Sequence, residues 1–476
     1  MRRPLMQFSS GFNFMLTLAM AALSLGLNGC VAHPGTKRPH VSSELACRTG
    51  HDLGPHKPPC ETLFPEAVHW DDGLSEEEAV ILGLWNNPSY QELLVDLQIT
   101  RADLITASQL TNPQVTNLFP IGVKQWEFYL SLPIDVIWLR PRRVAIAQLE
   151  NQRVAERLVQ DGLNVVRDIR VAYADLVFAE QRFALAEYGF SLRNEMARIG
   201  EALLDAGAVS ELDISPVRLE ALFGEEELAR SAREVDIARA RFRFQIGLAT
   251  SDVPINLGPA SLASPPPLDP ELLIAEAITS RPDVRALELA FTAAVERRSL
   301  ARWDYFNIQA FLPDANGKGE KGFEAGPGLR FDAPILNQNQ GAKARTAAEA
   351  ERLRRQFVTR RDTAATEVRL AYAQLLQAEQ TLAIWREQVV PQAQTATDIA
   401  RNAFEEDAVS VFVVLETTRQ LLIGRARELE SEAGLRRAVA ELERSVGRRI
   451  LTTLPPRRTM EIVPLPQPAG PQVNQP

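Results

Sequence analysis

An internal duplication is the feature that most constrains how this chain of 476 residues can fold. Residues 169–176 (IRVAYADL) match residues 368–375 (VRLAYAQL), at an offset of about 200 residues. A similar offset pairs Ala179-Glu180-Gln181 with Ala378-Glu379-Gln380, Ala208-Val209-Ser210 with Ala408-Val409-Ser410, Asn87-Pro88 with Arg281-Pro282, and Gly247 with Gly447. Since chance does not preserve a register over such a length, we predict two homologous halves, at residues 73–256 and 271–450, joined by a linker at residues 257–270.

Each half is predicted to contain an opening helix, a β-hairpin, a very long helix, a turn and a return helix. The opening helices are expected at residues 75–109 and 270–302. Phe128, Leu130 and Leu132 alternate with more polar residues, and this period of two is typical of a strand. The predicted hairpin strands therefore cover residues 113–121 with the stretch around Leu130, and residues 306–314 with 328–335.

The long helices are expected at residues 141–205 and 341–404. Apolar residues in the second of them step by three and four, which is typical of a coiled-coil seam. The predicted seam is Ala364, Val368, Ala371, Leu375, Ala378, Leu382, Val389, Ala393, Ala396 and Ala400. A helix of that length is a rod of ~95 Å, which other helices must cover along its sides. The predicted fold class is therefore mainly α with a small β part.

The N-terminus is typical of an export signal. Arg2 and Arg3 precede an apolar stretch that ends at Leu27-Asn28-Gly29-Cys30, which resembles a lipobox. Residues 1–29 are then a lipoprotein signal peptide, and Cys30 is the lipidated first residue of the mature protein. The residue after Cys30 is Val31 and not the aspartate associated with inner-membrane retention, so the outer membrane is the expected destination. An ordinary signal peptide that happens to contain a cysteine is the alternative.

Residues 30–72 are predicted to form a tether rich in Pro, His and Cys. A disulfide between Cys47 and Cys60 is expected there, because exported proteins meet an oxidising compartment. All five histidines of the chain also lie in this segment, so a metal-binding arm is an alternative, although the spacing matches no compact zinc pattern. We predict no metal site. Residues 451–476 contain many prolines and are expected to be a disordered tail.

Several classes of function are disfavoured. The net charge of -9 argues against a nucleic-acid partner, which would need a basic face. No histidine follows His69 and no phosphate-binding loop is present, so we predict neither an enzyme nor a cofactor. After the N-terminus no apolar run approaches the ~20 residues of a membrane-spanning helix. Insertion into a membrane would therefore use strands or lipid.

The duplicated pattern resembles the TolC-like outer-membrane efflux proteins over residues 73–447. Its most specific part is residues 334–341 (PILNQNQG), which look like the strand-to-helix crossover of the CzcC-like cation-efflux branch. The resemblance implies a homotrimer whose long helices form an α-helical barrel across the periplasm. It also implies a shared twelve-stranded transmembrane β-barrel, to which each subunit gives four strands. The implied partners are a periplasmic adaptor protein, an inner-membrane pump of the proton-driven type, and outer-membrane lipid.

By the same resemblance, the turns of the two long helical hairpins are the periplasmic tips, which hold the closed aperture and dock on the adaptor. The predicted aperture and docking residues are Asp205, Gly207, Ser210, Asp213, Arg401, Glu405, Glu406, Asp407 and Ser410. Repeated around a threefold axis, their carboxylates would form a ring that favours cations. Arg401 and Arg419 are candidate partners for salt bridges that hold the tip shut. Solvated carboxylates beside a turn are the alternative.

The predicted function is an outer-membrane channel subunit, lipid-anchored and extending into the periplasm, that passively exports small molecules or metal cations. The sequence does not decide between metal cations and drugs as the cargo. A periplasmic adaptor or coiled-coil scaffold lipoprotein is the first alternative. A metal-binding lipoprotein that uses the histidine-rich arm is the second, and it would lose metal binding on deletion of residues 31–66.

Overall fold

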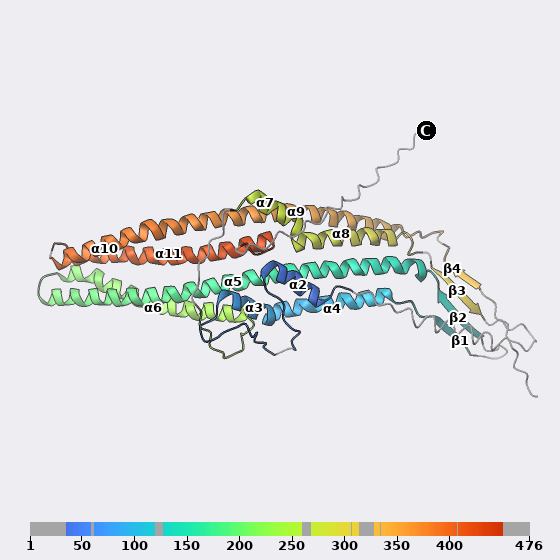
Figure 1. The fold of residues 1–476 in the computed structure, drawn as a ribbon, viewed down its shortest axis with the longest axis horizontal. Coiled ribbons are helices and arrows are strands. Elements are labelled where there is room, and N and C mark those ends of the chain that lie inside the picture. The colour runs from blue at the N-terminus through green and yellow to red at the C-terminus, as the bar shows by residue number, and fades with distance from the viewer. Residues whose placement is uncertain are drawn as a thin grey trace, which may run out of the picture.

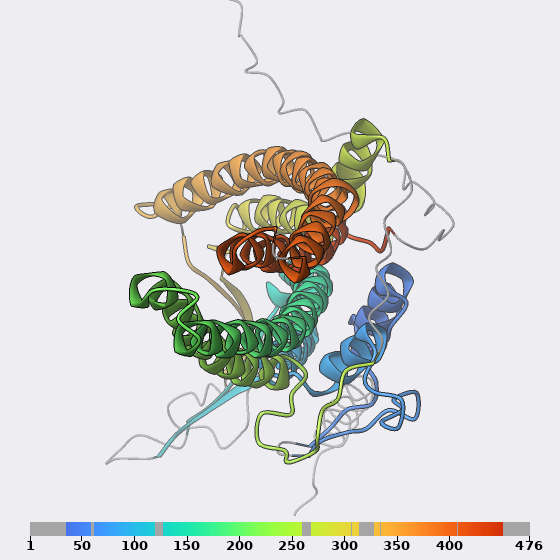
Figure 2. The same ribbon diagram turned by 90° about the vertical axis from the view of Figure 1, so that its left-hand side faces the viewer.

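The computed structural model describes residues 35–58, 61–119, 127–258, 268–305, 307–313, 328–333, 335–406 and 408–450. Long helices run side by side along the longest axis of the molecule, and four short strands lie at one end (Figure 1). Viewed from the opposite end, the two halves form two curved helical layers that face each other (Figure 2). The fold is mainly α with a small β part, as predicted.

The two halves contain their elements in the same order. The first half consists of α3 (Glu76–Asn86), α4 (Pro88–Ser108), β1 (Gln114–Leu118), β2 (Glu127–Pro133), α5 (Val136–Asp205) and α6 (Glu211–Gln245). The second consists of α7 (Pro270–Ser280), α8 (Pro282–Leu300), β3 (Ile308–Pro313), β4 (Gly328–Phe331), α9 (Gln340–Ile384), the π-helix η1 (Trp385–Val389), α10 (Val390–Glu405) and α11 (Val411–Val446). One further helix, α2 (Arg38–Thr49), precedes them.

The opening helix of each half is broken, and the prediction of one continuous helix in each half is wrong. Asn87 separates α3 from α4, Arg281 separates α7 from α8, and a proline follows each. The backbone is extended at both residues, with ψ of 116° and 132°. A proline ring clashes with a helical residue before it and supplies no N–H to the helix. The break therefore recurs in both halves for the same reason.

The second long helix contains a π-turn that the sequence did not predict. The N–H of Val390 bonds to the carbonyl of Trp385, five residues back, immediately before Pro391, which has no N–H to donate. The extra residue rotates the helix, so the seam continues through Val390 and Thr397 and not through the predicted Val389 and Ala396, although Ala400 is buried as predicted. Before the π-turn the seam is buried as predicted, at Ala364, Val368, Ala371, Leu375 and Leu382.

The strands form one antiparallel sheet in the order β1-β2-β3-β4. Thr116 of β1 pairs with Tyr129 of β2, and Leu130 of β2 pairs with Leu312 of β3. Each predicted hairpin is present with shorter strands, and the β2–β3 pairing joins the sheet across the two halves. In the described part of the chain, β1 and β4 are therefore the edge strands.

Residues 35–58 are part of the folded body, which corrects the expectation that they belong to a tether. Val41 and Leu45 on α2 and Leu53 beyond it are fully buried in the same hydrophobic cluster as α3, α4 and α5. Arg48 donates hydrogen bonds to the carbonyls of Ser280 (2.8 Å) and Gly447 (3.0 Å), at the ends of α7 and α11. The segment thus binds the first half to the second.

Buried side chains of the described residues gather in three hydrophobic clusters along the molecule. One lies in the first half, one in the second, and the third at the tips of the long hairpins. Such a distribution fits an elongated body whose helices cover one another. Among the described residues, no helix is both long enough and apolar enough to cross a membrane.

Candidate functional site at the helical tips and at the junction of the halves

The structure brings the two predicted tips together at the end opposite the strands (Figure 1). Met196 and Ile214 of the first hairpin lie in one hydrophobic cluster with Ala400, Val414 and Leu415 of the second. The two turns are therefore held at the same level by apolar packing between the halves.

The turn at the first tip is stabilised by backbone hydrogen bonds and by a cap at the start of α6. Asp205 is exposed at the end of α5, and Gly207 has a φ of 72°, a left-handed conformation that suits glycine. The Ser210 side chain accepts a hydrogen bond from the Asp213 N–H, while the Asp213 carboxylate accepts one from the Ser210 N–H at 3.0 Å. The Ser210 hydroxyl also donates to this carboxylate at 2.6 Å, and the two hydrogen bonds that the carboxylate accepts hold the pKa of Asp213 below its ordinary value. This capping box determines where α6 begins.

The second tip has a similar backbone without the side-chain cap. The Ala408 N–H donates to the Ala403 carbonyl at 2.8 Å, as the Ala208 N–H does to Leu203 at 2.9 Å. Ser410 makes no side-chain cap hydrogen bond to α11. Glu405, Glu406, Ser410 and Arg401 are exposed, whereas Asp407 lies outside the described residues.

The ion pairs at the tips differ from the expected ones. Arg218 binds Glu201 (2.5 Å) and Glu211, both within the first hairpin. Arg419 pairs with Glu416 of its own helix at 2.9 Å, so in one subunit it does not bind the acidic tip as predicted. The remaining tip acids, Asp205, Glu405 and Glu406, form no ion pair within the described part of the chain, and neither does Arg401. The tips thus present exposed negative charge.

The remaining predicted site residues lie away from the tips. Cys47 is exposed on α2, and Cys30 and Cys60 lie outside the described residues, so lipidation and the disulfide stay predictions. His51 contacts Glu77 at 2.6 Å and His69 contacts Glu78. Within the described segments, no three His, Cys, Asp or Glu side chains are grouped so that they could hold a metal ion.

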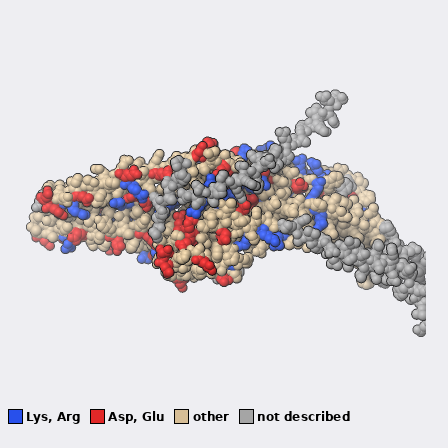
Figure 3. Space-filling view, in the orientation of Figure 1, with Lys and Arg blue, Asp and Glu red and all other residues tan. Residues whose placement is uncertain are grey.

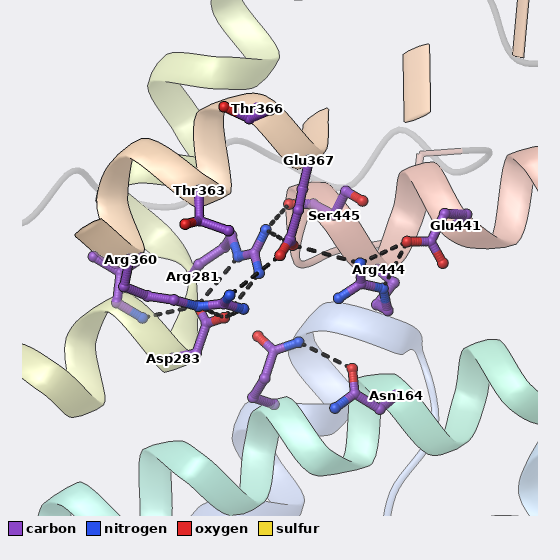
Figure 4. Close-up of polar contacts among 12 residues, drawn as sticks. Asn164, Arg281, Asp283, Arg360, Thr363, Thr366, Glu367, Glu441, Arg444 and Ser445 are labelled. Carbon is purple, nitrogen blue, oxygen red and sulfur yellow. Dashed lines mark hydrogen bonds and ion pairs between the residues drawn. The ribbon is translucent and has the colours of Figure 1, made fainter. Parts of the chain in front are cut away.

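The sequence did not predict a buried ion-pair network inside the second half, where α7, α8, α9 and α11 meet (Figure 4). Arg281 is fully buried and binds both carboxylate oxygens of Asp283, at 2.8 and 3.1 Å. It also pairs with Glu367 on α9 at 2.8 Å and donates to the Ser445 carbonyl on α11 at 2.9 Å. Arg360 contacts the same two carboxylates. The network therefore ties α7, α8, α9 and α11 together.

The electrostatics of this network favour the charged carboxylates. Burial raises the pKa of Asp283, but hydrogen bonds and charge from Arg281 and Arg360 outweigh that effect and hold its pKa below the ordinary value. The pKa of Glu367 is likewise raised by burial and lowered further by Arg281, Arg360 and Arg444. Both groups are therefore anions whose charge is compensated inside the protein.

A signal for Arg281 was present in the duplication. Its counterpart in the first half is Asn87, whose side-chain amide donates to the Gln245 carbonyl at the end of α6 at 2.9 Å. Arg281 donates to Ser445 in the same place near the end of α11. In both halves the residue before the proline thus binds a carbonyl that the return helix leaves without a partner at its C-terminus.

Polar contacts also join the first half to the second. Arg170 on α5 is almost fully buried and binds Glu443 on α11, and it also pairs with Glu77 on α3 at 3.3 Å. Arg437 of α11 lies 2.6 Å from Asp175 of α5. The two layers are therefore held by charged pairs as well as by apolar packing.

Comparison with known proteins gives relatives in sequence and in fold, although no family model matches the chain. The cobalt-zinc-cadmium resistance protein CzcC of Cupriavidus metallidurans is 22% identical over 383 residues, covering 79% of this chain and 90% of CzcC. The outer membrane efflux protein BepC of Brucella suis is 29% identical over 151 residues, covering 31% of this chain and 32% of BepC. The solved outer-membrane channel OprN matches with a TM-score of 0.66 at 17% identity, covering 84% of this chain and 99% of the OprN chain.

Proposed function

We propose that this chain, a TolC-like outer-membrane efflux protein by sequence and fold, is the outer-membrane channel subunit of a tripartite efflux system. The family resemblance identified in the sequence is confirmed by these relatives. In this role the chain is a passive conduit from the periplasm to the exterior. It catalyses no reaction and takes no cofactor.

One observation carries the proposal most directly. Two hairpins of long helices place both tips at one end, while all four strands lie at the other end (Figure 1). A sheet with open edges on both sides cannot face lipid, because its unpaired backbone groups would be left without partners. Three copies that join β1 of one to β4 of the next would close a twelve-stranded barrel. Their helices would then form an α-helical barrel on the same axis.

The partners follow from the same arrangement. The tips would dock on a periplasmic adaptor, which connects the channel to an inner-membrane pump of the proton-driven type. Asp205, Glu405 and Glu406 are exposed there without ion pairs in the described chain, so three copies would form a ring of carboxylates. We propose this ring, with Asp407 and Arg401, as the aperture.

The membrane anchor and the bounds of the repeats complete the proposal. Residues 1–29 would be removed as a signal peptide, and acyl chains on Cys30 would hold the protein at the outer membrane. Residues 73–256 and 271–450 would be the two repeats of each subunit. The relative CzcC is a cobalt-zinc-cadmium resistance protein, which favours metal cations over drugs as the cargo.

Membrane fractionation followed by mass measurement tests this function. We expect the protein in the outer-membrane fraction, and we expect the detergent-purified particle to have the mass of three chains plus bound detergent. A monomer recovered from the soluble periplasmic fraction would overturn the proposal.

A further inference from the structure

Six basic side chains surround the place where the helices meet the strands. This basic collar consists of Arg142, Arg143, Arg298, Arg302, Lys343 and Arg345. Its members come from the start of α5, the end of α8 with the residues after it, and the start of α9. All six are therefore close in sequence to a helix end that leads into or out of a strand.

Contacts in the structure hold these three segments at one level. Arg142 donates to the hydroxyl of Ser299, and Arg143 pairs with Asp304 at 3.1 Å. The Lys343 ammonium lies 4.4 Å from the centre of the Tyr305 ring, a cation–π contact. In addition, the Asn339 side chain donates to the Ala301 carbonyl at 3.1 Å. The collar is therefore one surface and not three separate groups.

Large apolar side chains next to the collar are exposed. The exposed fractions are 68% for Ile137, 41% for Trp138, 50% for Trp303, 79% for Ile335 and 95% for Leu336. Exposed apolar residues gathered in one zone indicate a surface that something covers. Tryptophan beside arginine and lysine is typical of the boundary between hydrocarbon and headgroups, where one end of the side chain is apolar and the other polar.

Three members of the collar have charges that are available to a ligand. Arg298 and Arg302 are exposed and form no ion pair within the described residues. Arg345 is 80% exposed and, among the residues that the structure describes, pairs only with Glu349 on the next turn of its helix, a pair that water weakens. Basic side chains gather over the half of the body nearer the strands, whereas acidic ones are prominent at the middle and at the tips (Figure 3).

We propose that the basic collar binds the phosphate groups of anionic phospholipids in the periplasm-facing leaflet of the membrane. The inference rests on the proposed function, because the strands must be inserted for the collar to reach this leaflet. Headgroup phosphates supply the negative charge that complements the collar, and their acyl chains cover the adjoining Ile335, Leu336 and Trp303.

Quenching of tryptophan fluorescence by brominated lipids tests this binding. The full chain is reconstituted into phosphatidylcholine vesicles that contain dibrominated phosphatidylglycerol or dibrominated phosphatidylcholine. Trp138 and Trp303 adjoin the collar, and a Trp138→Phe, Trp303→Phe variant gives the signal of the remaining tryptophans. We expect the anionic lipid to bind about threefold or more tightly than the neutral one at low salt. The preference should fall towards one in about 1 M salt, where the Debye length is about 3 Å.

The collar variant carries Arg298→Gln, Arg302→Gln and Arg345→Gln, and its preference for phosphatidylglycerol should fall to about one. The matched control carries Arg198→Gln, Arg425→Gln and Arg427→Gln, three exposed arginines nearer the tips, and should keep the full preference. Equal quenching by both lipids in the unmodified protein would overturn the inference while leaving the channel intact. No quenching by either lipid would overturn the inference and the proposed function together.

Discussion

Among single residues, Arg281 has the clearest structural role. Its guanidinium is fully buried and binds Asp283, Glu367 and the Ser445 carbonyl. A buried charge is costly unless every partner is in place, and removal of one partner leaves the others uncompensated. Arg281 therefore holds two carboxylates in their charged form at the meeting point of four helices.

We predict that Arg281→Leu lowers the free energy of unfolding by about 3–5 kcal/mol, since Asp283 and Glu367 would lose their principal partner. Denaturation followed by circular dichroism measures the change. Arg427→Gln is the matched control, because Arg427 is exposed and its one ion pair within the described part of the chain is with Glu430 on its own helix. That control should change stability by less than about 0.5 kcal/mol. Equal effects of the two substitutions would contradict the role given to Arg281.

Stability should also depend on pH through the same residues. The folded-state pKa values of Asp283 and Glu367 lie below the ordinary values. Their contribution is therefore fully present above a pH of about 4 and is lost as pH falls through the lower folded-state values. A series of unfolding curves in acid should show this loss in the native chain and a smaller loss in Arg281→Leu. An equally steep loss in the variant would contradict the assignment.

Burial of Arg281 could not be predicted from the sequence, because arginine is mostly exposed in folded proteins. The duplication did align it with Asn87, and the proline after each marks a backbone that leaves the helix. The partners Glu367 and Ser445 lie far along the chain, so only the fold shows that the three meet.

At the scale of elements, the two tips share a backbone but differ in their caps. Ser210 forms a capping box with Asp213 at the start of α6, whereas Ser410 makes no side-chain cap bond at the start of α11. The duplicated sequence Ala-Val-Ser therefore has two local structures, because the residue three positions after Ser210 is an aspartate and that after Ser410 is Val413.

We predict that Ser210→Ala destabilises the first turn of α6 by about 1 kcal/mol, the usual contribution of such a cap. Ser410→Ala should change the first turn of α11 by less than about 0.5 kcal/mol. Amide hydrogen exchange at the two turns measures both effects in one experiment. Matching increases in exchange at both tips would show that the cap at Ser210 adds no stability.

The long, strongly periodic elements were predictable, and local irregularities were not. The alternation around Leu130 predicted β2, and the apolar steps from Ala364 to Leu382 predicted α9. The π-turn before Pro391 changes the helix by a single residue, so the apolar pattern alone did not reveal it. At the tips, the turns were placed correctly, but the ion pair of Arg419 with Glu416 depends on rotamers within one helix.

At the scale of the whole molecule, residues 35–58 are part of the folded body. Leu45 is fully buried, and Arg48 binds carbonyls at the ends of α7 and α11. The composition rich in Pro and His predicted a tether. The apolar residues spaced along α2 instead pack against the hydrophobic surface of α3, α4 and α5. Deletion of residues 31–66 would therefore disturb the fold, and it cannot serve as a neutral test of metal binding.

We predict that Leu45→Ala lowers the free energy of unfolding by about 2–5 kcal/mol, because it leaves a cavity between α2 and the helices beneath it. Ser43→Ala, on the exposed side of the same helix, is the control and should have an effect below about 0.5 kcal/mol. Thermal unfolding of the purified protein compares them. If neither substitution changes the thermal unfolding, the segment does not contribute to the stability of the fold.

Single-channel conductance of the purified protein in a planar lipid bilayer is the most direct test of the proposed channel function. A conduit with its acidic tips closed should give a small conductance that favours cations, and the conductance should rise when Arg401 is replaced by glutamine. Replacement of Asp205, Glu405 and Glu406 by their amides should reduce the preference for cations, because the proposed ring loses its charge. If neither the native protein nor any of these variants conducts ions, the proposed channel function is wrong.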